Sequence, residues 1–158
     1  MATYLLDTGI LLGYVRGAGY ADYVERKFGL SQAGNIPLVS IVSKGEIYSL
    51  AIQLGWGEQK RQELDNLLRR IPSVDINTDR IIQRYAEIDA YSQGKDPVKP
   101  LPRGLTSRNM GKNDLWIAAT ASVLRAQLLT TDKDFDHLNG SFIDLVYIDR
   151  NLTVTDAE

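Results

Sequence analysis

The chain has 158 residues, of which 44% are hydrophobic and 24% charged, a composition typical of one globular domain with a substantial core. Its net charge of −2 argues against a protein that holds nucleic acid through its overall field alone, so any such site must be a local patch or use bound cations. With no Cys and one His, the sequence excludes disulfides, zinc–thiolate sites, thiol nucleophiles and mechanisms that need two imidazoles.

The chain contains no apolar run near the roughly 20 residues needed to span a bilayer. Met1 leads almost directly into the apolar residues 3–6 without a basic leader, so we expect neither a signal peptide nor a membrane anchor. A cytoplasmic location is the simplest interpretation. We expect one domain over residues 1–150, followed by a polar tail over 151–158.

The first part of the chain predicts two strands separated by helices. Residues 3–6 are continuously apolar, as in a central parallel strand, and end at the turn residues 7–9. Helices are expected over 10–12 and onward and again over 21–28, with a glycine-containing break between them. Residues 36–42 predict the second strand.

The middle of the chain predicts three helices and an edge strand. Ser43 is expected to open a helix with apolar residues at helical spacing through Leu54, and the next helix is expected to stop at Pro72. Residues 74–76 suit a short edge strand. Thr78 is a suitable N-cap for the helix that follows.

The last part of the chain contains its most apolar stretch. Residues 92–113 predict a long loop rich in proline and glycine. After Asp114, residues 115–124 predict a helix buried on most of its circumference, and 128–130 predict an interior strand. A last strand is expected over 144–148. About five strands alternate with helices, which indicates an α/β fold with a mostly parallel sheet.

Four carboxylates fall where such a sheet presents its ligand crevice. Asp7 and Asp132 follow strands, and Glu46 and Asp114 are expected in the first turns of helices. Each also has a structural explanation: an Asx turn for Asp7, a capping box with Ser43 for Glu46, the helix dipole for Asp114, and a simple loop position for Asp132.

Together, the four acids favour a site for a divalent cation. Clustered carboxylates repel each other unless one is protonated or a cation lies between them. Oxygen ligands without His or Cys suit Mg²⁺ or Mn²⁺, which lowers the pKa of a bound water and stabilises charge on a phosphoryl centre.

Four segments carry a resemblance to a known family: YLLDT at 4–8, SIVSKGE at 40–46, NDLWIAATA at 113–121 and LLTTDKDF at 128–135. In this order and spacing they resemble the PIN-domain family, and within it the VapC-type toxins of bacterial toxin–antitoxin pairs. The resemblance implies a three-layer α/β/α sandwich around a mostly parallel five-stranded sheet. It also implies a Mg²⁺- or Mn²⁺-dependent endoribonuclease that cleaves RNA phosphodiesters.

The resemblance also implies roles for individual residues and partners. Its metal-binding and catalytic acids correspond to Asp7, Glu46, Asp114 and Asp132. Partners would be an RNA substrate such as tRNA, an antitoxin protein and a second copy of the chain. The chain departs from the family at Gly9, where Asn or Ser is common. Auxiliary positions in the same motifs are Asp134, Thr8 and Thr131.

Basic residues gather in the predicted loop over 92–113. Arg103, Arg108 and Lys112, together with Lys44 near Glu46, are candidates for contacts to RNA phosphates, and the alternative is a solvated loop.

Other side chains have simpler expectations. His137 is expected at the surface or in local packing rather than as a base. Leu11, Leu12, Tyr14, Tyr20 and Tyr23 would form either core or an exposed surface for a dimer partner or antitoxin.

Two other functions remain open. A phosphoryl-accepting domain of receiver or phosphatase type would use Asp7 as nucleophile, but it needs a D-x-D pair where the chain has Asp7-Thr8-Gly9. A catalytically silent PIN-like binding module would not need the complete set of four acids.

Overall fold

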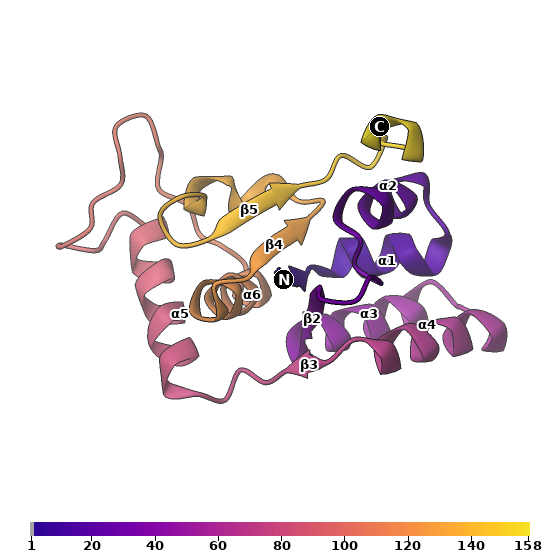
Figure 1. Cartoon of the computed structure of the whole chain (residues 1–158). Helices are drawn as coiled ribbons and strands as arrows, with labels where there is room; N and C mark the ends of the chain where they lie inside the picture. Colours follow the sequence, from indigo (N-terminus) through magenta and orange to yellow (C-terminus); the bar gives the residue numbers. More distant parts are fainter. Residues whose placement is uncertain (1) are drawn as a thin grey trace.

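The computed structural model describes residues 2–158 and contains a five-stranded sheet in the order β3-β2-β1-β4-β5 (Figure 1). Every neighbouring pair of strands is parallel, so the sheet is parallel throughout rather than mostly so. The first strand lies at the centre of the sheet and the short third strand at its edge, as predicted. The strands are β1 (Thr3–Leu6), β2 (Ile36–Ser40), β3 (Ser73–Val74), β4 (Gln127–Thr130) and β5 (Asp144–Tyr147).

Helices connect these strands and cover both faces of the sheet, which confirms the predicted three-layer α/β/α architecture. The α-helices are α1 (Thr8–Arg16), α2 (Gly19–Phe28), α3 (Ile41–Gln53), α4 (Glu58–Arg70), α5 (Asp79–Ser92) and α6 (Lys112–Leu124). Two 3₁₀ helices follow near the C-terminus, η1 (Lys133–Leu138) and η2 (Val154–Ala157). Among residues 2–158, no helix combines the length and apolar content needed to cross a membrane.

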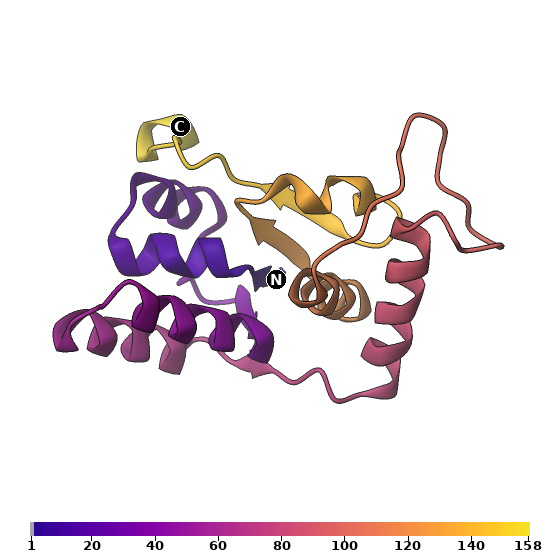
Figure 2. The ribbon, with the colours of Figure 1, turned by 180° about the vertical axis from the view of Figure 1, so that it is seen from behind.

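Alternate residues of the central strands point into two separate cores. Leu6 of β1 and Leu129 of β4 join the core formed with α1 to α4, whereas Leu5 and Leu128 join the core formed with α5 and α6. Such alternation is the geometric consequence of a strand, whose successive side chains lie on opposite faces. Seen from opposite sides, the ribbon shows α1 to α4 grouped on one side of the strands and α5 and α6 on the other (Figures 1 and 2).

Helix α6 is buried on most of its circumference, as its apolar sequence predicts. Every residue from Ile117 to Ser122 is buried. Its neighbour α5 packs along it, and the rings of Tyr85 and Trp116 meet with centroids 4.3 Å apart. At the start of α5, Thr78 accepts a hydrogen bond from the backbone N–H of Ile81 at 3.2 Å, so the predicted N-cap is confirmed.

The second strand ends earlier than predicted. Ser40, not Ser43, caps α3, and its Oγ accepts from the backbone N–H of Val42 at 3.1 Å. Ile41 and Val42 therefore form the first helical turn, and Ser43 is buried inside the helix. The β-branched side chains of Ile41 and Val42 favour a strand locally, but the pairing of β2 with its neighbour β3 ends at Ser40. The predicted capping box between Ser43 and Glu46 is wrong.

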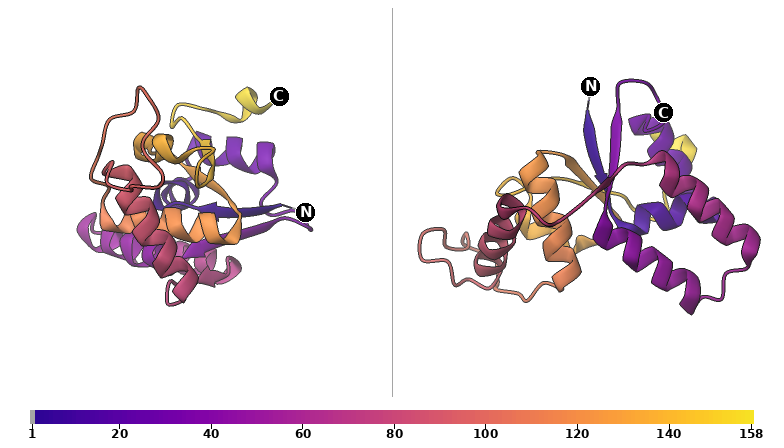
Figure 3. Two further views of the ribbon diagram at one scale, coloured as in Figure 1. Left: turned by 90° about the vertical axis from the view of Figure 1, so that its left-hand side faces the viewer. Right: turned by 90° about the horizontal axis from the view of Figure 1, so that it is seen from below.

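The C-terminal residues, expected to be a polar tail, return to the body of the molecule. Helix η2 lies against α2 (Figures 1 and 3). A capping box joins Thr153 and Asp156, with the Thr153 N–H 2.7 Å from the carboxylate, and Arg26 pairs with Glu158 at 3.6 Å. In contrast, residues 93–111 project as an extended loop beyond α5 and α6 (Figure 3).

Candidate active site

The carboxyl edge of the sheet gathers acids from distant parts of the sequence. Asp7 directly follows β1 and Asp132 follows β4, and these two strands are parallel neighbours. The backbone N–H of Asp7 also donates to Leu129 O at 2.9 Å, which fixes the end of one strand against the other. Parallel neighbours end at the same edge of a sheet, so these two acids lie close together.

Asp7 is buried, with 7% of its surface exposed, and both of its oxygens accept hydrogen bonds. One oxygen accepts from the backbone N–H of Thr8 at 2.8 Å, because Asp7 caps α1. The other accepts from the hydroxyl of Thr130 at 2.6 Å. Sequence reasoning missed Thr130, although a hydroxyl on the last residue of an apolar strand is a usable signal. Asp7 therefore caps α1 through the N–H of Thr8, not through that of Gly9 as the expected Asx turn requires, and this cap is compatible with a place at the site.

Thr8 joins Asp7 to Glu46. Its hydroxyl donates to Glu46 Oε1 at 2.9 Å, while its backbone N–H donates to Asp7. Glu46 lies in the second turn of α3 and not in the first, since the helix begins at Ile41. Its carboxylate thus binds a side chain 38 residues away rather than capping its own helix. Thr8, predicted as a hydroxyl partner of the acids, has this contact.

Three further acids form the tightest group. Carboxylate oxygens of Asp114, Asp132 and Asp134 all lie within 4.8 Å of one another. Asp114 projects from the first turn of α6, and Asp132 caps η1 by accepting from the backbone N–H of Asp134 at 2.9 Å. Asp134, expected only as an auxiliary residue, therefore belongs to this group. We call the five residues the acid cluster: Asp7, Glu46, Asp114, Asp132 and Asp134.

Burial and mutual repulsion raise the affinity of two members for protons. Burial raises the pKa of Asp7 to about 6, even though the hydrogen bonds from Thr130 and Thr8 oppose the shift. The charges of Glu46 and Asp132 raise it further.

Burial also raises the pKa of Asp114 to about 7, with contributions from the charges of all four other members of the acid cluster. The five carboxylates therefore interact electrostatically as one group.

Among the described residues, no lysine, arginine or histidine forms an ion pair with this group. Within residues 2–158 the ion pairs are Arg26–Glu158 and Arg84–Glu87, and neither involves the acid cluster. A hexacoordinate Mg²⁺ at about 2.1 Å from its ligands separates ligand oxygens by roughly 3–4 Å, close to the spacing among Asp114, Asp132 and Asp134. Donor type, spacing and uncompensated charge all fit a hard divalent cation such as Mg²⁺ or Mn²⁺.

An open cleft of about 540 Å³ adjoins the cluster between α1, α3 and α6, lined among others by Thr8, Glu46 and Asn113.

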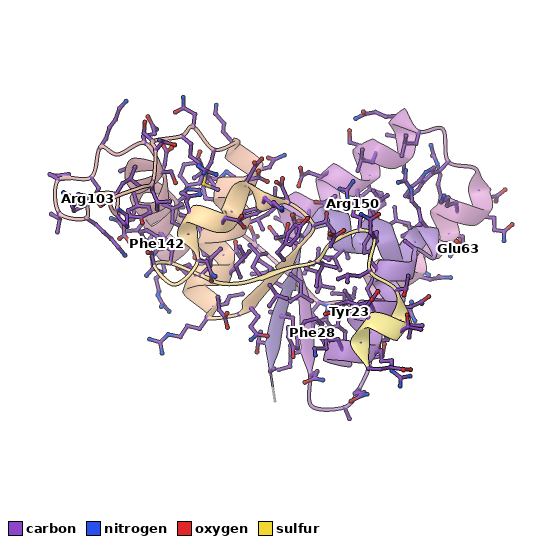
Figure 4. All side chains as sticks on the ribbon, turned by 90° about the horizontal axis from the view of Figure 1, so that it is seen from above. Tyr23, Phe28, Glu63, Arg103, Phe142 and Arg150 are labelled. Carbon is purple, nitrogen blue, oxygen red and sulfur yellow. The ribbon has the colours of Figure 1, made fainter. Side chains whose placement is uncertain are left out.

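The candidate basic residues lie at different distances from the cluster. Arg108 donates to the backbone carbonyl of Asp134 at 3.5 Å, and Lys112 begins α6 two residues before Asp114. Lys44 is partly buried on α3, two residues before Glu46. Arg103 is exposed at the outer end of the molecule, on the loop (Figure 4).

His137 is buried inside η1 rather than at the surface, with 5% of its surface exposed. Its Nε2 lies 2.8 Å from the hydroxyl of Ser92, which also is buried. Burial, with a smaller contribution from the charge of Arg108, lowers the pKa of His137 to about 4. It is therefore neutral near pH 7 and packs η1 against the end of α5.

The aromatic residues of the early helices belong mainly to the core. Leu11 and Tyr20 are buried, and Tyr20 donates to the backbone carbonyl of Gly9 at 2.8 Å. Tyr14 is partly buried and donates to Glu25 at 2.9 Å. The core interpretation thus holds for the best-buried members.

Comparison with solved structures gives the same fold at low sequence identity. VapBC2 from Rickettsia felis, bound to a DNA fragment from its promoter, matches with a TM-score of 0.72 and 23% identity, covering 93% of this chain and 99% of that one. VapBC-1 from nontypeable Haemophilus influenzae matches with a TM-score of 0.65 and 24% identity, covering 92% and 97%.

A third structure, VapBC-5 from Mycobacterium tuberculosis, is a member of the VapBC family of toxin–antitoxin systems. It matches with a TM-score of 0.57 and 18% identity, over 93% of this chain and 99% of that one.

A comparison with curated proteins gave no match. The family model of the PIN domain, however, matches residues 4–141, a range that begins in β1 and includes all five members of the acid cluster. By this match and by its fold, the chain belongs to the PIN-domain family.

Proposed function

We propose that this protein is a divalent-metal-dependent endoribonuclease and the toxin of a toxin–antitoxin pair. The observation that carries the proposal is the acid cluster: five carboxylates at the carboxyl edge of a parallel sheet, within electrostatic reach of each other and with no ion pair to a basic side chain of residues 2–158. Such a group is costly for the folded state unless a ligand cation offsets its charge.

In this proposal Asp7, Glu46, Asp114 and Asp132 bind the cation or the water that it activates, with Asp134 completing the group on the solvent side. When bound, Mg²⁺ or Mn²⁺ would lower the pKa of water and offset negative charge on the phosphodiester. The protein's own contribution is orientation.

Hydrogen bonds within the protein provide that orientation. Thr130 and Thr8 hold both oxygens of Asp7, and Thr8 also holds Glu46 on the opposite helix. The carboxylates of Glu46 and Asp114 remain the candidates for accepting a proton from the attacking water.

RNA as the substrate is supported by the cleft beside Glu46 and by the basic residues Arg108, Lys112 and Lys44 on the elements around it. The direct test is cleavage of single-stranded RNA and of tRNA by the purified protein with Mg²⁺ or Mn²⁺, with chelator added, and by an Asp114→Asn variant. A matched control is Glu63→Gln on the exposed face of α4, which removes an acid far from the cluster (Figure 4).

We expect metal-dependent cleavage by the wild type and by Glu63→Gln, and none above background with chelator or Asp114→Asn. Cleavage that persists in chelator, or in Asp114→Asn, would contradict the proposal.

An antitoxin is the proposed protein partner, because the solved structures with this fold include VapBC toxin–antitoxin systems. A cleft of about 510 Å³ lies between α1, α2 and α4, and its apolar lining includes Leu30, Leu67 and Ile71 beside Arg70 and Glu25. This cleft suits an amphipathic peptide segment with an acidic group near Arg70. Arg70→Glu should relieve inhibition by the antitoxin without changing RNA cleavage. Unchanged inhibition would remove the cleft from the proposal.

A homodimer is also proposed, and sedimentation of the purified chain tests it directly. The phosphoryl-accepting alternative has less support, because Gly9 stands where the second acid of a D-x-D pair would follow Asp7. A silent binding module that binds no cation would carry the destabilising repulsion within the acid cluster with nothing to offset it.

A further inference from the structure

Arg150 lies on the connection between β5 and η2, which leaves the sheet at the same carboxyl edge as the acid cluster. The connection begins beside the end of β4, where the backbone N–H of Ile148 donates to Thr130 O at 2.8 Å. In Figure 4 Arg150 is near the middle of the molecule, whereas Arg103 lies at its outer end. Its position is therefore set by the sheet and not by the projecting loop.

The guanidinium of Arg150 reaches the residue next to Asp132. Its Nη2 donates to the hydroxyl of Thr131 at 3.3 Å. That hydroxyl occupies the space directly beside Gly9, where a Cβ atom would overlap it. Because Gly9 has no side chain, Thr131 Oγ1 can lie against the first turn of α1. The same oxygen accepts the hydrogen bond from Arg150, so Thr131 connects Arg150 to the start of α1.

Arg150 has donors to spare at a site rich in negative charge. An arginine side chain offers five N–H donors, and Thr131 uses one of them. Within residues 2–158, no carboxylate lies within ion-pair distance of Arg150, including those of the acid cluster. The neighbouring Asp149 instead accepts from the backbone N–H of Asn151 at 2.8 Å. The guanidinium is exposed and free to bind an anion.

Both ends of the connection are anchored, so the guanidinium is held in place by more than its own contact. Ile148 is buried, and Leu152 packs against the core formed by α1 to α4. Beyond it, η2 is capped at Thr153 and lies against α2. An anchored arginine loses less conformational entropy on binding than one on a free loop.

We propose that Arg150 binds a backbone phosphate of the RNA substrate beside the acid cluster. The proposal rests on the proposed ribonuclease function. A planar guanidinium binds phosphate oxygens in pairs, and its positive charge offsets a phosphate that the surrounding carboxylates would otherwise repel. The C-terminal connection therefore contributes a substrate-binding residue to the site, and Thr131 positions it.

The test compares Arg150→Ala, Arg150→Lys and Thr131→Val with wild type, using Arg80→Ala on the exposed start of α5 as the matched control. Steady-state cleavage of single-stranded RNA with Mn²⁺ gives kcat and KM. Binding of the same RNA with Ca²⁺ in place of Mn²⁺, measured across a salt series, reports the number of phosphate contacts. Mn²⁺ affinity and the melting temperature report the integrity of the site and fold.

We expect Arg150→Ala to lower kcat/KM by roughly 10- to 100-fold, as the loss of one charge-assisted hydrogen-bonded contact does. The slope of log affinity against log salt should fall by about 0.7, the value for one phosphate contact on a single strand. Arg150→Lys should lose less. Thr131→Val should cause a smaller loss that disappears in the Arg150→Ala background, since both act through one contact.

Arg150→Ala that matches Arg80→Ala in kcat/KM and in salt slope would overturn the proposal while leaving the ribonuclease function intact. A tenfold or greater loss of Mn²⁺ affinity in Arg150→Ala would also overturn it, because the residue would then act on the metal site. Wild-type protein that fails to cleave any RNA with Mg²⁺ or Mn²⁺ would instead remove the proposed function, and this inference with it.

Discussion

The acid cluster and the loop over residues 93–111 carry opposite charges and are built in opposite ways. Each acid at the sheet edge follows a strand or lies in the first two turns of a helix, and hydroxyls and backbone N–H groups hold Asp7, Glu46 and Asp132. The loop is held instead by contacts spread along it, among them the bond from Arg108 N to Ser92 O at 2.8 Å and Lys99 Nζ at 4.1 Å from the centre of the Phe142 ring. Its tip, with Arg103, is exposed.

The difference separates two tasks. A cation site needs oxygens fixed to within a few tenths of an ångström, which buried strands and helix starts provide. Contact with a polymer's phosphates needs charge near the site but tolerates adjustment, which a loop provides. Breaking the first region should therefore abolish chemistry, and breaking the second should only weaken binding.

The largest effect should come from neutralising an acid. Asp114→Asn should lower kcat for RNA cleavage by about 10³-fold or more, because one oxygen ligand of the tightest acid group is lost. In chelator it should melt at a higher temperature than wild type at pH 7.5, since repulsion within the acid cluster is relieved. If Asp114→Asn kept wild-type activity, the assignment of chemistry to the acid cluster and of binding to the loop would be wrong.

A pH series on the metal-free protein should measure the cost of charging Asp7, including its repulsion with Asp114. The folded-state pKa of Asp7 is raised from 3.8 to about 6, so the folded protein holds this proton more tightly than the unfolded chain. Wild-type stability from this group is therefore highest in acid and falls as the pH rises from about 4 to about 7. Asp7→Asn should gain up to about 3 kcal/mol over wild type at pH 7.5 in chelator, and nothing at pH 4.

Comparison with Asp7→Asn is needed because His137 acts in the opposite direction. Its pKa is lowered to about 4, so its contribution to stability rises with pH up to its unfolded value of 6.5. Both proteins share this contribution, and the difference between their urea-unfolding free energies cancels it. A pH-independent difference would show that burial does not shift the pKa of Asp7.

Mn²⁺ should raise the melting temperature of wild type at pH 7.5, because a cation that binds only the folded protein stabilises it.

A smaller effect is expected from the buried hydroxyl at the end of β4. Thr130→Val leaves one oxygen of Asp7 and the backbone N–H of Asp132 without their partner, which should cost about 1–3 kcal/mol of unfolding free energy. The control is Thr120→Val, another fully buried threonine, whose hydroxyl only bonds back to Trp116 O in its own helix. Equal losses in both variants, measured by urea unfolding, would mean that Thr130 has no special role.

The smallest effects should come from the loop and from Lys112, the first residue of α6 after it. Arg108→Ala and Lys112→Ala should each weaken RNA binding by roughly 3- to 10-fold and lower the salt slope by about 0.7 per lost phosphate contact. Arg103→Ala, at the exposed tip, should change binding less. If Arg103→Ala caused the largest loss of RNA affinity among the three variants, the loop tip would have to fold onto the substrate. That result would strengthen the contrast between a rigid sheet edge and an adaptable loop.

Sequence patterns predicted most of the fold because they report local physics. Continuous apolar runs predicted β1, β4 and the buried helix α6, helical spacing predicted α4, and Thr78 predicted the start of α5. Patterns were wrong where two local structures suit the same residues. Ile41 and Val42 are apolar and β-branched, yet they form the first turn of α3, since β2 ends its pairing with β3 at Ser40.

The acids themselves were predictable from their place after strands and near helix starts. Their hydrogen-bond partners were not, because Thr130 and Asp7 are 123 residues apart and only the pairing of β1 with β4 brings them together. The same holds for Arg150, which nothing in its own segment marks as part of the site. Its contact with Thr131 depends on where the C-terminal connection crosses the sheet edge.

The amino-acid sequence by itself determined the order of strands and helices along the chain, the two apolar faces of the sheet and the presence of acids after strands and near helix starts, since periodicity and residue type are local properties. Tertiary structure decided which acids share one electrostatic environment, which hydroxyls orient them and which arginine stands beside them. These features depend on pairing between distant strands, and burial and Coulomb repulsion act on distances in space rather than along the chain.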